Sequence, residues 1–95
     1  MSHTLRRREA PELFDLLDRA EALIELEYAT RKDLAKFLKV TPQRVYEWFS
    51  ARIKHPLGET TLQIQLWAEA LETNIRGRKL TAYRSAIEQM KEKHP

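Results

Sequence analysis

Residues 31–49 of the chain read RKDLAKFLKVTPQRVYEWF, and their apolar letters fall into two short helical patterns. Thr30 is placed to cap the start of the first pattern, and Asp33, three residues later, completes a short form of the capping box. The apolar positions of this pattern recur at helical spacing at Leu34, Ala35, Phe37 and Leu38. The pattern predicts a helix over 31–38 that buries one face.

The second pattern opens with a start signal for a new helix. Thr41 offers a hydroxyl cap, and Pro42 follows at the first helical position, where no backbone hydrogen bond is lost. Further along, apolar side chains three and four residues apart define an inward face at Val45, Trp48 and Phe49. We therefore predict a helix over 42–53 with an exposed polar face, joined to the first by a tight turn. Two such helices over 30–52 are a helix-turn-helix.

Three further apolar stripes predict the remaining helices. The first follows Pro11 and predicts a helix over 11–28, whose acids Glu12, Asp15, Asp18, Glu21 and Glu25 are expected to form a solvated face. The second predicts a helix over 59–73 through Leu62, Leu66, Trp67, Ala70 and Leu71. The third predicts a C-terminal helix over 80–93 through Leu80, Tyr83, Ile87 and Met90. The 95 residues thus predict a single all-α domain, 1–95, a compact bundle of about five helices with a basic arm over 1–10.

Composition excludes several classes of site. The chain has no cysteine, and its three histidines have no partners at ligand spacing, so we expect neither a metal nor a cofactor. No apolar run approaches the ~18 residues of a membrane span, and the first residues lack the apolar core of a signal peptide. We expect no membrane contact, no small-molecule ligand, no enzymatic activity, and a cytoplasmic, nucleoid-associated location.

Charge is sorted into blocks along the chain. Residues 1–8, 30–58 and 74–95 carry net charges of +3, +5 and +4, whereas 9–29 and 59–73 carry −6 and −3. Positive charge therefore coincides with the predicted helix-turn-helix and with both tails. This distribution is expected of a protein that lies on phosphates with one side and keeps an acidic surface elsewhere.

The segment 31–51, with Leu34, Ala35, Leu38, Val40, Val45 and Trp48, resembles the helix-turn-helix of the lambda-repressor-like superfamily, the Cro and phage-repressor type. The stretch PLGETTLQIQLWAEAL is similar to the helix that comes after the motif in that family, so the resemblance covers roughly 30–72. The family usually has glycine where this chain has Lys39, a position that tends to need a positive φ. A lysine there costs on the order of 1 kcal/mol.

A second, local resemblance is to the recognition helix of a homeodomain. Thr41, Val45, Trp48, Phe49, Arg52 and Lys54 match that helix in spacing. The chain departs from the homeodomain at Ala51, where the family carries its adenine-reading asparagine, and Pro56 stops the helix early. Either resemblance implies that the helix over 42–53 enters the major groove of DNA.

Four residues are candidates to read bases. Gln43 can pair bidentately with adenine, Tyr46 can touch a thymine methyl group or a phosphate, and Glu47 can accept a hydrogen bond from cytosine. Pro42 offers only apolar contact. Each has an alternative: Gln43 can simply lie in solvent, and Glu47 can pair with Arg44 within the helix.

Contacts to phosphates and to the minor groove are assigned to polar and basic residues. The phosphate set is Arg31, Thr41, Arg44, Ser50, Arg52 and Lys54, with Lys36 as a weaker member. The arginines of the arm, Arg6, Arg7 and Arg8, suit a narrow minor groove, although a merely solvated tail is the alternative.

The sequence thus predicts a small transcriptional regulator, a repressor of bacterial or phage type, whose partner is double-stranded DNA. A homodimer can form through Leu80, Tyr83, Ile87 and Met90, but the same stripe can instead close the core of the monomer, which is the favoured alternative. In a different class, the fold can serve as a protein-interaction module, an antitoxin or an adaptor, with the acidic first helix and the last helix binding a protein partner.

Overall fold

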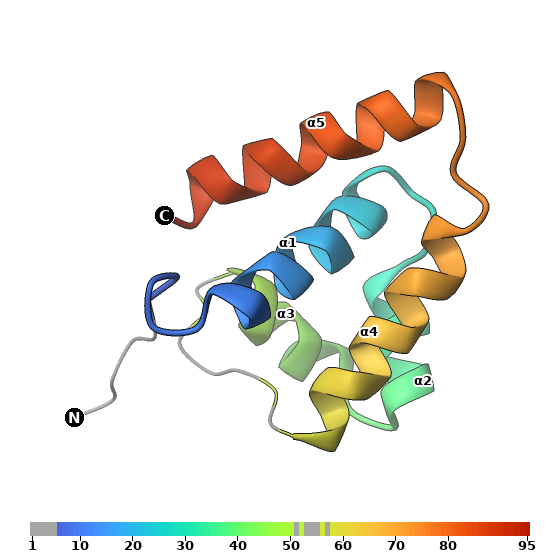
Figure 1. Ribbon diagram of the computed structural model, residues 1–95. Helices are drawn as coiled ribbons and strands as arrows, with labels where there is room; N and C mark the ends of the chain where they lie inside the picture. Colours follow the sequence, from blue (N-terminus) through green and yellow to red (C-terminus); the bar gives the residue numbers. More distant parts are fainter. Residues whose placement is uncertain (1–5, 51, 53–55, 57) are drawn as a thin grey trace.

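The computed structural model describes residues 6–50, 52, 56 and 58–95, and within these residues the chain forms five α-helices and no strand (Figure 1). The helices are α1 (Pro11–Glu25), α2 (Arg31–Leu38), α3 (Pro42–Ser50), α4 (Glu59–Glu72) and α5 (Arg78–Lys93). The predicted all-α class with about five helices is confirmed.

Local chemistry explains where the helices begin and end. The hydroxyl of Thr30 accepts a hydrogen bond from the Asp33 amide at 3.1 Å, and the Asp33 carboxylate accepts one from the Thr30 amide at 3.0 Å. This capping box starts α2 as the sequence predicts. The first helix is shorter than predicted, because Glu27 takes a left-handed backbone with φ 64° and α1 has already ended at Glu25. At the other end of the chain, α5 begins directly after Gly77, which has φ 62°, two residues earlier than predicted.

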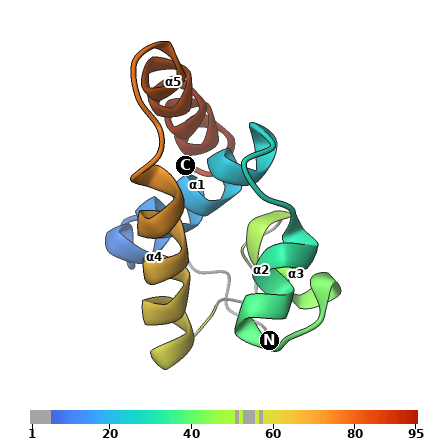
Figure 2. The same ribbon diagram turned by 90° about the vertical axis from the view of Figure 1, so that its right-hand side faces the viewer.

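The core is built around α1, which contacts α3, α4 and α5. One cluster of buried side chains joins α1 to α2, α3 and α4 through Leu17, Leu34, Val45, Trp48 and Ile64. A second joins the C-terminal half of α1 to α4 and α5 through Leu23, Ala68, Ile75, Tyr83 and Ala86. Figure 2 shows the resulting arrangement, with α2 and α3 together on one side and α4 on the other.

Two predicted apolar faces are wrong in part. On α2, Phe37 is 50% exposed, although its neighbours in the predicted stripe are buried. On α4, Leu62 and Leu66 are 61% and 62% exposed, because the helix buries the stripe that contains Ile64 and Ala68 instead. The apolar residues of α4 surround the helix, and only one of the overlapping stripes faces the core.

The last helix lies along α1 and runs in the opposite direction (Figure 1). Tyr83 and Met90 are buried within the chain itself, and Leu80 and Ile87 pack half-buried against the second core cluster. The stripe thus packs within the monomer, as in the alternative, and Leu80 and Ile87 stay partly accessible. A homodimer through this stripe remains a prediction. No helix in the described part of the chain is long and apolar enough to cross a membrane.

Candidate nucleic-acid interface

The α2–α3 pair is joined by only three residues, 39–41. Lys39 adopts the left-handed backbone, with φ 58° and ψ 42°, at the position where the sequence resemblance expects a glycine. The hydroxyl of Thr41 then accepts a hydrogen bond from the Arg44 amide at 3.2 Å and caps the start of α3. The lysine conformation and the threonine cap together turn the chain sharply between the two helices.

Burial divides α3 into two faces. The inner face carries Val45, Trp48 and Phe49, all buried in the core cluster with α1, α2 and α4. The outer face carries most of the predicted base and phosphate contacts, and these are exposed: Thr41, Pro42, Gln43, Arg44, Tyr46 and Ser50. Glu47 lies on the same outer side of the helix but is half-buried. The structure thus brings these predicted site residues together on one accessible surface, which we call the α3 outer face.

Arg31 connects the beginning of α2 to this surface. Its guanidinium carbon lies 5.2 Å from the centre of the Tyr46 ring, so the positive charge is held over the aromatic face. Beside this pair lies a small hollow of about 150 Å³, whose walls include Glu21, Glu25 and Ser50. The Arg31 charge therefore stands between the acidic side of α1 and the α3 outer face.

Arg52 does not belong to the interface, which corrects its predicted phosphate contact. The residue is 2% exposed, and its Nη2 atom lies 3.0 Å from Asp18 Oδ1 and 3.2 Å from Glu21 Oε1. Its Nη1 atom donates to the carbonyl of Phe14 at 3.3 Å. A guanidinium enclosed in this way has no surface to present to a phosphate. The other late member of the set, Lys54, lies outside the described residues, as do positions 51 and 53 of the predicted helix.

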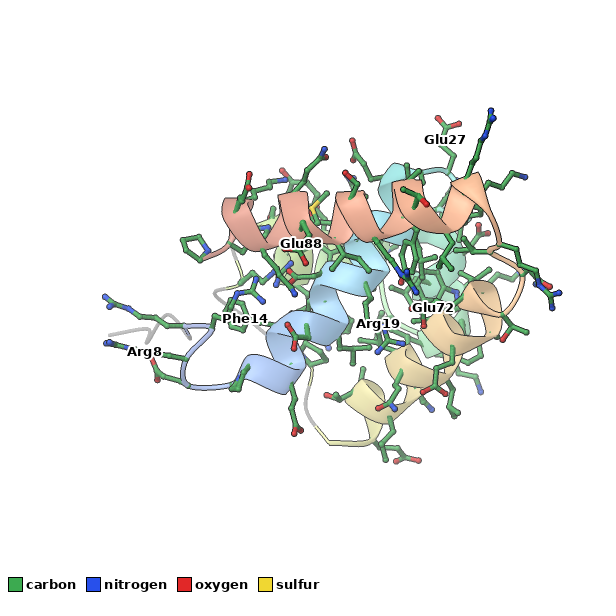
Figure 3. The ribbon with its side chains drawn as sticks, turned by 45° about the horizontal axis from the view of Figure 1, so that its top comes forward. Arg8, Phe14, Arg19, Glu27, Glu72 and Glu88 are labelled. Carbon is green, nitrogen blue, oxygen red and sulfur yellow. The ribbon has the colours of Figure 1, made fainter. Side chains whose placement is uncertain are left out.

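The predicted arm is also only partly free. Arg7 donates to Asp18 Oδ2 at 2.7 Å and to the carbonyl of His94 at 2.7 Å, so it is a structural residue and its predicted minor-groove role is corrected. Arg6 and Arg8 are exposed, and Figure 3 shows Arg8 pointing away from the body of the molecule. A backbone hydrogen bond of 2.9 Å from the Glu9 amide to the Arg6 carbonyl folds this segment into a turn. The first five residues lie outside the described part.

Asp18 is the centre of a buried polar cluster that the sequence does not reveal. Instead of lying on a solvated face, it is 0% exposed and pairs with both Arg7 and Arg52. His94 completes the cluster, with Nε2 3.3 Å from Glu21 Oε1; burial, together with the positive charge of Arg52, lowers the pKa of this histidine. The cluster connects α1, the end of α3 and both ends of the described chain.

Comparisons of the chain with protein-family models, with curated proteins and with solved structures gave no match. Among the described residues there is also no group of three or more histidine, aspartate or glutamate side chains arranged to hold a metal ion. The resemblance to lambda-repressor-like proteins therefore rests on the sequence of residues 30–72 alone and remains a prediction.

Proposed function

We propose that this protein is a sequence-specific double-stranded DNA-binding protein, a small transcriptional regulator that inserts the N-terminal part of α3 into the major groove. The observation that carries the proposal is the division of α3: its apolar side chains are buried, and the side chains able to contact DNA are exposed together. A helix held in this way presents a rigid polar surface to a groove that is wide enough to admit it.

Gln43 is the principal base reader in this proposal. It is exposed in the first turn of α3, and its amide can donate to adenine N7 and accept from the adenine amino group. Tyr46 stands one turn further along the same surface and contacts a thymine methyl group or a phosphate. Pro42 contributes apolar contact, and Glu47 accepts a hydrogen bond from cytosine.

Phosphate contacts come from the two ends of the site. Arg31 at the start of α2 and Arg44 in α3 are both exposed, and Thr41 and Ser50 add hydroxyl groups. Such contacts position the protein on the duplex without reading its sequence. The stretch 31–50 has five basic and two acidic residues, so its net charge favours phosphates.

The experiment that tests the proposal is selection of bound duplexes from a random library at about physiological salt. We expect the wild type to enrich a short motif and Gln43→Ala to lose the preference at one adenine of it. Gln89→Ala, which removes an exposed glutamine from α5, is the matched control and should select the same motif as the wild type. If the wild type enriches no motif, sequence-specific DNA binding is ruled out.

The same selection reports on repression by a dimer. Two half-sites about one helical turn apart would indicate that two copies bind together. A single short motif would indicate a monomer. Repression, as opposed to activation, is then tested by placing the selected motif over a promoter and measuring the transcript with and without the protein.

A further inference from the structure

A groove between α1 and α4 lies outside the surface that the DNA-binding proposal uses. Its volume is about 840 Å³, and its walls come from residues 9–19 on one side and 61–65 on the other. Apolar atoms of Pro11, Leu13 and Leu62 contribute to these walls. The groove therefore offers apolar contact alongside its polar groups.

The exposed leucines of α4 extend this apolar surface. Leu62 and Leu66 are four residues apart on the same side of the helix, and more than half of each residue is exposed. Leu62 lines the groove, and Leu66 lies beside it, outside its wall. The core of the protein uses neither of them. Holding two leucines in water carries a free-energy cost that burial against another molecule removes.

Acidic side chains border the groove. Glu12 and Asp15 lie on its α1 side and are exposed, and Asp15 is also paired with Arg7 at 3.4 Å. The one basic residue in its wall, Arg19, is paired with Glu72 and so adds no free positive charge. The described part of the groove thus combines an apolar wall with a negative rim.

This combination decides between possible occupants. A second copy docked symmetrically would bring two negative rims together, and DNA would be repelled in the same way. A partner with apolar side chains at helical spacing, flanked by lysine or arginine, matches both the leucines and the acids. We propose that the α1–α4 groove binds a basic amphipathic helix of a partner protein, with Leu62 and Leu66 as the apolar anchors.

The groove and the α3 outer face lie on different sides of the molecule. In Figure 1, α1 and α4 face the viewer and α3 lies behind them, and in Figure 2 the α2–α3 pair is on the side opposite α4. A partner in the groove therefore leaves α3 accessible. The inference goes beyond the proposed DNA binding and does not depend on it.

The test uses a synthetic amphipathic helix of leucine and lysine, about four turns or ~14 residues long, titrated into the ¹⁵N-labelled protein. We expect chemical-shift changes around 10–16 and 61–66. We also expect the combined change Leu62→Ser and Leu66→Ser to raise the Kd about tenfold or more. Phe37→Ser is the matched control, because it removes an exposed apolar side chain of α2 and should leave the Kd unchanged.

Charge is tested separately, with variants whose fold is checked by circular dichroism. Glu12→Lys should weaken binding of the lysine peptide, Glu88→Lys on α5 should not, and a peptide with glutamate in place of lysine should not bind. Equal binding of both peptides, or shift changes distributed over α5 or α3, would overturn the proposal. Self-association of the protein that the two leucine changes abolish would also overturn it, in favour of a second copy. Duplex selection by the same variants separates this failure from a failure of DNA binding.

Discussion

At the scale of single residues, Asp18 is the one fully buried acid among the described residues. It is fully buried and has two arginine partners, one of which, Arg52, is itself buried. Asp18→Asn keeps the size of the side chain but removes the negative charge from between two cations. Because buried Arg52 would keep only Glu21 as an anionic partner, and Arg7 only the exposed Asp15, we expect the free energy of unfolding to fall by about 3 kcal/mol, measured by urea denaturation.

Asp15→Asn is the control for this change. Asp15 also faces Arg7, at 3.4 Å, but its side chain is 58% exposed. An exposed ion pair contributes at most about 1 kcal/mol, so this variant should unfold almost like the wild type. Similar losses in the two variants would contradict a special role for the buried carboxylate.

A substitution at Lys39 is expected to increase the free energy of unfolding, whereas Asp18→Asn is expected to decrease it. Its left-handed backbone costs a residue with a Cβ atom about 1 kcal/mol, and glycine adopts it without this strain. Lys39→Gly should therefore stabilise the protein by up to about 1 kcal/mol, seen as a higher Tm. Lys36→Gly, inside α2, should instead destabilise it by about 1 kcal/mol, because glycine is a poor helix former. A lower Tm for Lys39→Gly would show that relief of backbone strain is not the dominant effect.

Features that depend on near neighbours in the sequence could be predicted, and features that depend on distant ones could not. The caps at Thr30 and Thr41 and the turn at Lys39 involve residues a few positions apart. The burial of Arg52 depends on Glu21, 31 residues earlier in the chain, and on Phe14, 38 residues earlier. The residues next to Arg52 in the sequence therefore do not indicate that its side chain is buried.

At the scale of helices, a polar contact between α1, α4 and α5 fixes how these elements pack. Arg19 of α1 and Glu72 of α4 point toward each other (Figure 3) and form an ion pair, and the hydroxyl of Tyr83 in α5 donates to Glu72 at 2.7 Å. Tyr83→Phe removes this hydrogen bond to a charged group. We expect a loss of about 1.5–3 kcal/mol in the free energy of unfolding, whereas Tyr46→Phe on the exposed face of α3 should cost almost nothing. Equal effects would mean that the hydroxyl of Tyr83 does not join the helices.

The same contact predicts that the free energy of unfolding depends on pH in both the acid and the alkaline range. Burial opposes the charge of Glu72, but hydrogen bonds from Arg19 and Tyr83 outweigh it and lower the pKa below the ordinary 4.5. The stabilisation is therefore present above pH 4.5 and is lost as the pH falls through the lowered value. Burial and the nearby Glu72 raise the pKa of Tyr83 above its ordinary 10.0, so its contribution is present below pH 10 and is lost as the pH rises.

Urea titrations at several pH values check this dependence. Tyr83→Phe should abolish the alkaline part and reduce the acid part, because Glu72 loses one of the two donors that lower its pKa. An unchanged alkaline profile in Tyr83→Phe would contradict the assignment.

The two faces of α4 show why the sequence predicts the helix but not its orientation. Apolar residues at 62, 64, 66, 67, 68, 70 and 71 nearly surround it, so several stripes satisfy the helical period. Contact with α1 and α2 selects the stripe of Ile64 and Ala68, which leaves Leu62 and Leu66 outside. The existence of the α1–α4 groove follows from that choice and is invisible in the sequence pattern. On α5, by contrast, the predicted apolar stripe is the one that faces the core, because it packs against α1 and closes the core of the monomer.

At the scale of the whole molecule, charge and shape separate two surfaces. The side formed by the N-terminal part of α1 and by α4 is mostly acidic and contains the groove, whereas the α2–α3 pair is basic and carries the α3 outer face. The charge blocks of the sequence indicate this separation. Because Arg7 and Arg52 are bound to Asp18, the positive charge available to DNA is smaller than a count of basic residues suggests.

If the proposed DNA binding holds, its salt dependence tests which arginines touch phosphates. Each phosphate contact adds about 0.9 to the slope of log K against log salt concentration, because bound counterions are released. Arg44 is exposed on α3, so Arg44→Gln should weaken binding to all sequences alike and reduce the slope by about 0.9. Arg84→Gln removes an exposed arginine of α5 and is the control, with an unchanged slope. If Arg44→Gln loses the preference at one base pair but keeps the slope, Arg44 reads a base instead of a phosphate. If Arg44→Gln and Arg84→Gln show equal slopes and equal affinities, the α3 outer face is excluded as the surface that meets DNA.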